Sequence, residues 1–206
     1  MFKAKTDIKK IKQFIFQRYN LNIMEMYGDG IPLEYVENID DLIFSMPPSM
    51  QYHALLMTHY LFSEKDYNRV LKIIWTENNY PNIQSNSVIV SLFRISNPEL
   101  LMSKREQKEF NKLPDNVTLY RGVETKKHKK HSLSWTTDLK VAKVFANRHK
   151  ALLIEEERKI IQATIKKKYV FAYFINKVMI KEFDETEVIV NPDYLKDIKT
   201  VTIIKP

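Results

Sequence analysis

The sequence contains no cysteine and only three glycines among its 206 residues. The absence of cysteine excludes disulfide bonds, thiol nucleophiles and cysteine-ligated zinc. It fits a protein of a reducing compartment, and it equally fits a secreted toxin that crosses a membrane unfolded. Lysines interrupt the apolar residues of segment 1–16, so we expect an amphipathic helix there rather than a signal peptide. We therefore expect no membrane association and a cytoplasmic location, in the producing cell or in a target cell.

Positive charge is in excess, since 33 Lys and Arg oppose 25 Asp and Glu and give a formal net charge of +8. This sign favours anionic partners such as nucleotides, nucleic acid or acidic protein surfaces, but it does not choose among them. A basic surface that only keeps the protein soluble explains the same composition. The length and the 44% hydrophobic content indicate one large globular domain or two small ones.

The first half of the chain has helical patterns. Apolar residues in segment 6–19 recur at the spacing of one helix face. Further helices are predicted over 35–44, 50–62, 63–75 and 98–112, with a turn at 28–32. Segment 85–95 fits either a strand or a buried helix, and we favour the helix. The turn Leu113-Pro114-Asp115-Asn116 ends the last helix, so we place a domain boundary there, with a helical region at 1–114 and a second region at 115–206.

The second region has the pattern of short strands. Runs rich in Ile, Val, Tyr and Phe predict strands over 117–123, 132–136, 151–155, 159–165, 169–174, 187–190 and 201–204, with one helix over about 137–149. The predicted fold class is α+β, with the helical N-terminal region packed on a compact mixed sheet.

The stretch Tyr120-Arg121-Gly122 holds the one glycine that follows Gly30. In a chain so poor in glycine, we expect Gly122 to serve a close backbone approach or an unusual φ. The predicted strand fixes Arg121 on a sheet, where its planar guanidinium suits a phosphate or a carboxylate. Taken alone, the stretch also fits an ordinary ion pair followed by a turn glycine.

Two other stretches carry polar side chains on predicted strands. Ser134 and Thr136 are two residues apart, so both hydroxyls are expected on one strand face, with Thr137 or Asp138 capping the following helix. Glu185 and Glu187 share a face by the same rule, and Glu187 opens an apolar strand. Two carboxylates side by side are costly unless they are used. Read singly, these stretches are also compatible with a helix cap and with an acidic turn.

Together the three stretches resemble the Arg-Ser-Glu class of ADP-ribosyltransferases. The matching residues are Tyr120-Arg121-Gly122, then Ser134-Trp135-Thr136 with Val141-Ala142 and Phe145, then Glu185-Thr186-Glu187-Val188-Ile189. The resemblance covers about residues 115–206. Trp135 and Thr136 depart from the Ser-Thr-Ser pattern of the class, and the helical first half is longer than the preface expected in its smallest toxins.

The resemblance implies an enzyme that cleaves NAD, its substrate, and transfers ADP-ribose. Glu187 would stabilise the positively charged ribose, because a carboxylate beside the ribose suits an oxocarbenium-like centre. Arg121 would hold a phosphate of NAD, Gly122 would accept the carboxamide, and Ser134 would orient Glu187. Glu185 would take the proton of the acceptor. The implied NAD contacts also include Tyr120, Thr136 and Phe145.

The acceptor is less defined by the sequence. Glutamate at Glu185 goes with arginine acceptors in this class, so a protein arginine is our first expectation. Transfer to RNA or DNA is the alternative, favoured by the net charge and by the basic residues Lys126, Lys127, Lys129 and Lys130.

The same basic run also fits a solvated loop. Its lysines make His128 and His131 poor metal ligands, so we expect no metal. An inactive module that binds NAD or a protein is a further alternative.

Overall fold

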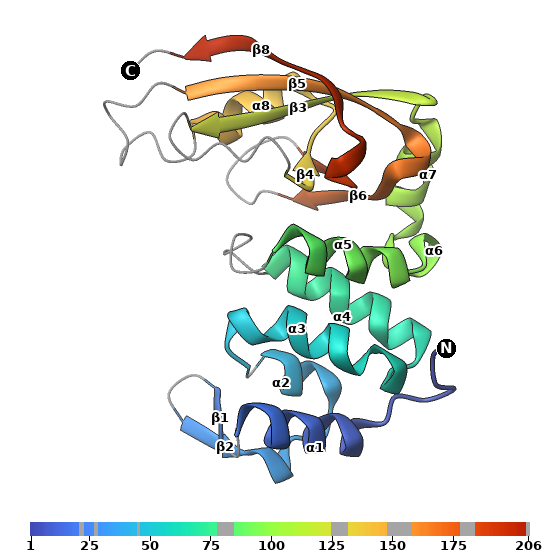
Figure 1. Ribbon diagram of the computed structural model, residues 1–206, viewed down its shortest axis with the longest axis vertical. Helices are drawn as coiled ribbons and strands as arrows, with labels where there is room; N and C mark the ends of the chain where they lie inside the picture. Colours follow the sequence, from blue (N-terminus) through green and yellow to red (C-terminus); the bar gives the residue numbers. More distant parts are fainter. Residues whose placement is uncertain are drawn as a thin grey trace. The chain divides into compact units, whose positions relative to one another are not determined.

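The computed structural model describes residues 1–20, 23–26, 29–44, 46–77, 85–124, 132–147, 158–177 and 184–204. These residues form an α+β protein, as the sequence predicts (Figure 1). The chain divides into two compact units, Met1–Leu101 and Met102–Pro206. The first, here called the helical unit, is built mainly of helices. The second, here called the sheet unit, holds two three-stranded sheets.

The helical unit contains the helices that the sequence predicts, with shifted ends. Its helices are α1 (Ile8–Tyr19), η1 (Leu33–Tyr35), α2 (Ile39–Phe44), α3 (Pro48–Thr58), η2 (His59–Leu61), α4 (Glu64–Glu77), α5 (Asn86–Ile95) and α6 (Pro98–Leu101). The ambiguous segment 85–95 is helical, because Ile89, Val90, Leu92 and Phe93 are buried at helical spacing on one face of α5. The preference for helix in this segment is thus confirmed.

Two predictions for the first half are wrong in detail. Asp29–Pro32 is a strand, β2, and pairs antiparallel with β1 (Ile23–Met26) rather than forming a turn. The single helix predicted over 98–112 is two helices, α6 and α7 (Lys104–Lys112). Ser103 separates them because it is the N-cap of α7, accepting a hydrogen bond from the Glu106 backbone N–H.

The sheet unit contains α7 and six strands among its described residues. The strands are β3 (Asn116–Glu124), β4 (Ser134–Trp135), β5 (Arg158–Lys166), β6 (Val170–Lys177), β7 (Asp184–Val190) and β8 (Lys196–Ile204); α8 spans Leu139–Ala146, and the short helices η4 and η5 span Lys167–Tyr169 and Pro192–Tyr194. The strand expected at 151–155 lies outside the described residues. The expected mixed sheet is wrong for the described strands, whose pairings are all antiparallel.

The strands are arranged in the orders β3-β5-β8 and β4-β7-β6. An isolated antiparallel bridge joins Tyr120 of β3 to Thr136, just after β4. Its two backbone hydrogen bonds measure 2.7 and 2.9 Å. The bridge brings β3, β4 and β7, which carry the three stretches singled out in the sequence, next to one another.

Helix α7 belongs to the sheet unit, although the sequence pattern groups it with the helices. The Tyr173 N–H of β6 points at Met102 Sδ at 3.2 Å, and the Ile175 N–H donates to Glu106 Oε1 at 3.1 Å. These contacts satisfy N–H groups of β6 that no strand takes up. The two units therefore divide after Leu101, earlier than the boundary expected at residue 114.

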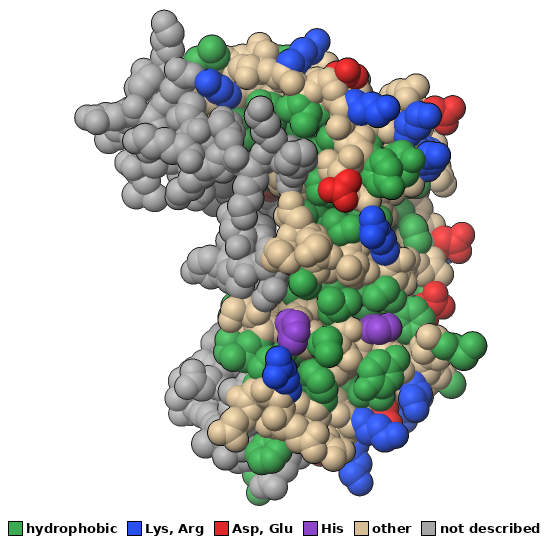
Figure 2. Space-filling view, in the orientation of Figure 1, with side chains coloured by type: hydrophobic (Ala, Val, Ile, Leu, Met, Phe, Trp, Pro, Cys, Tyr) green, Lys and Arg blue, Asp and Glu red, His purple; other side chains and the backbone are tan. Residues whose placement is uncertain are grey.

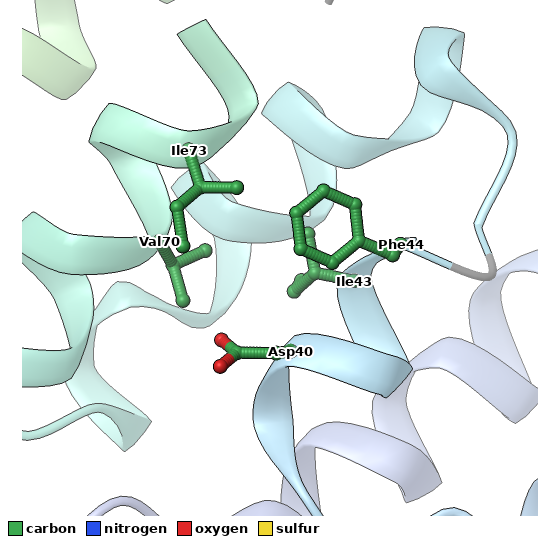
Figure 3. A pocket seen from close by; sticks show the side chains of 5 residues that line it. All are labelled: Asp40, Ile43, Phe44, Val70 and Ile73. Atoms are coloured by element: carbon green, nitrogen blue, oxygen red, sulfur yellow. The ribbon is translucent and has the colours of Figure 1, made fainter. Parts of the chain in front are cut away.

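A shallow depression in the helical unit is lined by Asp40, Ile43, Phe44, Val70 and Ile73 of α2 and α4 (Figure 3). It is too small to enclose a water molecule. Its one charged side chain, Asp40, is bonded to Arg69. We therefore assign no ligand to it.

Candidate functional site

Strand β3 turns Arg121 toward the interior of the sheet unit. Val117, Leu119 and Val123 are buried, and Arg121 lies on the same strand face by the period-two rule. Its Nε has no exposed surface and, among the described residues, no hydrogen-bond partner. Its Nη1 donates to the Ser134 carbonyl oxygen at 2.5 Å. The guanidinium thus links β3 to β4 through Nη1, while its Nε donor has no partner in the described part of the chain.

Gly122 faces the other side of β3, toward α8. A Cβ built on Gly122 would lie 2.4 Å from the Ala146 backbone nitrogen and 2.5 Å from the Ala142 carbonyl oxygen. The close backbone approach predicted for this glycine is therefore with α8 of the same chain. Nothing larger than glycine fits at this crossing without moving the helix.

Ser134 and Glu187 meet across strands β4 and β7. Ser134 pairs with Ile189 in the register of these strands, and Glu187 is two residues from Ile189, on the same face. Ser134 Oγ donates to Glu187 Oε1 at 2.5 Å. Glu187 is partly exposed, whereas the Val188, Ile189 and Val190 that follow it are fully buried. The hydrogen bond expected between these side chains is therefore present in the structure.

Arg121 and Glu187 also interact electrostatically. Burial lowers the pKa of Arg121, and the negative charge of Glu187 acts against this and raises the pKa. An arginine stays charged in proteins in spite of such a shift. The site therefore holds a fixed cation next to a carboxylate that is oriented by a serine hydroxyl.

Thr136 is used within the structure. It is buried, its hydroxyl lies 3.0 Å from Thr186 Oγ1, and it accepts a hydrogen bond from the Asp138 N–H at 3.1 Å. Ser134 and Thr136 therefore bond to neighbouring residues of β7 that point to opposite faces, rather than presenting their hydroxyls on one face. The pairing partner also changes at this point, since Ser134 and Trp135 pair with β7 whereas Thr136 pairs with Tyr120 of β3. Asp138 caps α8, which confirms one of the two expected caps.

The other expected site residues lie near this centre or support it. Glu185 is on β7, two residues before Glu187 and on the same strand face, and is partly exposed. Tyr120 packs against Ala142, Ala146 and Ile160, so it serves the contact between β3 and α8. Phe145 is partly exposed on α8. As NAD contacts, Tyr120, Gly122, Thr136 and Phe145 stay predictions.

Sequence reasoning missed Thr186, the residue between the two glutamates. Its hydroxyl contact with Thr136 ties the start of β7 to the end of β4. Strand alternation alone places Thr186 on the face opposite both carboxylates. The signal in the sequence was a polar residue on that face of the predicted strand, because its hydroxyl could bond to the hydroxyl-rich stretch 134–137.

The basic residues Lys126, Lys127, Lys129 and Lys130 lie outside the described residues, as do His128 and His131. Within the part that the structure describes, no group of three or more His, Asp or Glu side chains is placed to hold a metal ion. The described helices also include none with the length and apolar character required to cross a membrane.

The chain was compared with protein-family models, with curated proteins and with solved structures, and none of the three comparisons finds a match.

Proposed function

We propose that the chain is a mono-ADP-ribosyltransferase that cleaves NAD, releases nicotinamide and transfers ADP-ribose to a macromolecule, first of all to a protein arginine. The observation that carries this proposal is the hydrogen bond from Ser134 Oγ to Glu187 Oε1, next to the buried guanidinium of Arg121. Three strands distant in sequence contribute these side chains. They are the Arg, Ser and Glu for which the class is named.

Glu187 is proposed to stabilise a cationic ribose. When the bond from ribose C1′ to the nicotinamide nitrogen breaks, both electrons leave with nicotinamide, and positive charge develops on the ribose. A carboxylate held in a fixed orientation stabilises that charge without having to reorganise. Ser134 supplies the fixed orientation, and the residues that follow Glu187 on β7 are fully buried, which anchors the strand.

Arg121 supplies the fixed positive charge that an anionic substrate needs. Its buried Nε is a donor without a partner in the described part of the chain, and a buried donor left unpaired is costly. A phosphate of NAD near the guanidinium would offset that cost. Because Nη1 is already bonded to Ser134, Arg121 also positions the strand that orients Glu187.

Glu185 is proposed to act on the acceptor. It shares the strand face of Glu187 at a distance of two residues along β7, so one carboxylate can face the ribose while the other faces the incoming nucleophile. The guanidine nitrogen of an acceptor arginine would bond to C1′, and its proton would pass to Glu185. Transfer to a nucleic acid is the second candidate, favoured by the net charge of +8.

The test separates the two glutamates by measuring nicotinamide release and label transfer from labelled NAD to a lysate or to total RNA. Glu187→Gln should slow both reactions by about 100-fold or more, since the charge stabilising the ribose is removed. Glu185→Gln should abolish transfer but keep slow NAD hydrolysis, because water can still attack the ribose. Glu109→Gln, on the surface of α7, is the matched control and should change neither reaction.

Circular dichroism of each variant establishes folding. Wild-type nicotinamide release by Glu187→Gln, or normal transfer by Glu185→Gln, would contradict the assigned roles. No nicotinamide release and no label transfer by the unmodified protein would favour a binding module instead. The fraction that takes up label, protein or RNA, identifies the acceptor class.

A further inference from the structure

A second surface of the sheet unit carries stacked aromatic rings beside exposed lysines. Tyr169 ends η4, which follows β5, and Tyr194 ends η5, which precedes β8. The pairing of Thr164 with Lys196 places the end of β5 beside the start of β8, and Figure 1 shows these two strands side by side. The two tyrosines therefore meet at one end of the sheet.

The two rings lie face to face. Their centroids are 3.6 Å apart and their planes differ by 6°. Aromatic pairs in proteins usually prefer offset or edge-to-face arrangements with larger centroid distances, as Trp75 and Phe93 show with an interplanar angle of 80°. The tyrosine spacing is instead close to the rise of about 3.4 Å between stacked bases in a nucleic-acid strand.

One ring of the stack also contacts a cation. The Lys168 ammonium lies over the Tyr169 ring, 5.0 Å from its centroid, which is a cation–π contact. Tyr194 is 39% exposed. Part of Tyr194 is therefore accessible to solvent beside the stack.

The charges around the stack are mainly positive. Lys166, Lys168 and Lys196 are exposed, as are two carboxylates, Asp193 next to Tyr194 and Asp197 next to Lys196; Asp197 accepts a hydrogen bond from Thr164. Lys167 is not counted among these lysines, because its Nζ donates to the backbone oxygens of Asn111 and Leu113. Figure 2 shows that basic side chains on one face of the molecule occur singly and in small groups. Lysines beside an exposed ring provide both contacts that single-stranded nucleic acids use, phosphate attraction and base stacking.

We propose that Tyr194, stacked on Tyr169 and flanked by Lys166, Lys168 and Lys196, is a binding surface for single-stranded RNA, on which one base continues the tyrosine stack. The lysines hold the phosphates on either side of that base. Binding at this surface does not depend on the base sequence of the RNA, because every base has a flat face and the lysines contact the RNA backbone. It goes beyond the proposed reaction and does not require it, since binding needs neither NAD nor Glu187.

The test is fluorescence anisotropy of the full chain with a labelled 12-nucleotide RNA of mixed sequence, without NAD. Tyr194→Ala should weaken binding by about tenfold or more, the usual effect of losing one base–aromatic stack. Tyr194→Trp should retain RNA binding, because tryptophan keeps a flat ring at this position. Tyr194→Leu should lose RNA binding, although leucine keeps an apolar side chain there. Tyr35→Ala is the matched control, because Tyr35 is an exposed tyrosine of the helical unit.

Lys168→Ala should reduce the slope of log affinity against log salt by about 0.7, the value for one phosphate contact on a single strand. Lys65→Ala, an exposed lysine of α4, should leave that slope unchanged. Undetectable RNA binding by the unmodified protein at 50 mM salt, or parent affinity in Tyr194→Ala and Tyr194→Leu, would overturn the proposal. Equal binding of poly(aspartate) with the same Tyr194 dependence would also overturn it, by assigning the surface to acidic proteins.

Nicotinamide release by Tyr194→Ala, measured without an acceptor, should equal that of the parent. The two proposals thus fail separately: lost RNA binding leaves NAD cleavage untouched, and absent NAD cleavage leaves RNA binding untouched.

Discussion

At the residue scale, Gly122 shows how the site depends on close packing behind it. The backbone of α8 approaches Gly122 so closely that an added Cβ would lie 2.8 Å or less from Ala146 N, Ala142 O and Ala146 Cα. Arg121 is the residue before it on β3. Any displacement of β3 away from α8 therefore shifts the guanidinium relative to Ser134 and Glu187.

We expect Gly122→Ala to lower the free energy of unfolding by about 1–3 kcal/mol, since the atoms it meets belong to the helix backbone and cannot rotate away. Urea unfolding measures the effect. Thr118→Ala is the control on the same strand, because Thr118 is exposed, and its effect should stay within about 0.5 kcal/mol. Wild-type stability of Gly122→Ala would mean that the crossing of β3 and α8 is looser than the structure shows.

At the element scale, one carboxylate joins α7 to the edge of the sheet. Glu106 is 4% exposed. Its Oε2 accepts the Ser103 N–H at 2.7 Å, completing a capping box, and its Oε1 accepts the Ile175 N–H of β6 at 3.1 Å. The same side chain thus caps a helix and satisfies a strand edge.

Glu106→Ala should lower the free energy of unfolding by about 2–4 kcal/mol, because it leaves two backbone N–H groups without their charged acceptor. Glu109→Ala removes a surface ion pair with Lys112 and should cost at most about 1 kcal/mol. Amide hydrogen exchange provides a second measurement, in which Ile175 should lose protection in Glu106→Ala alone. Equal stabilities of the two variants would show that Glu106 does not hold α7 on β6.

At the scale of the whole molecule, the acid stability of the helical unit depends on Asp66. Burial by itself raises the pKa of this carboxyl group, but hydrogen bonds from Thr6, Arg69 and Ser63 and the charge of Arg69 outweigh it, and the pKa is lowered overall. Thr6 Oγ1 and Ser63 Oγ donate to Asp66 Oδ2 at 2.5 and 2.9 Å. The network ties the N-terminal segment to α4.

A lowered pKa in the folded state contributes stability that is present above the unfolded pKa of about 3.9 and is lost as the pH falls through the folded value. Asp66→Asn should therefore be less stable than the wild type at pH 7, by about 1–2 kcal/mol for the charged hydrogen bonds removed. This difference should shrink below about pH 4, in urea unfolding series from pH 7 to pH 2. Asp115→Asn, at an exposed position, is the control. A difference that stays constant down to pH 2 would contradict the role of the carboxylate charge.

The sequence by itself determined the local features of this protein. Apolar spacing predicted α1, because one buried face imposes a period that the residues display. For α5 the sequence allowed a strand or a buried helix, and the favoured helix is the one that the structure contains. Runs of Ile, Val, Tyr and Phe predicted the strand over 117–123, which is present within β3. The scarcity of glycine predicted a close backbone approach or an unusual φ at Gly122, and the structure shows the close approach, to α8.

The tertiary structure alone decided which local features meet. Nothing in the sequence near residue 106 indicates that Glu106 reaches β6, since that contact depends on strands folded from residues 170–177. The antiparallel pairing, the β1–β2 hairpin and the use of the Thr136 hydroxyl by Thr186 likewise depend on register between distant segments. Periodicity specifies the face on which a side chain lies, but the neighbour across that face is set by the packing of the whole chain.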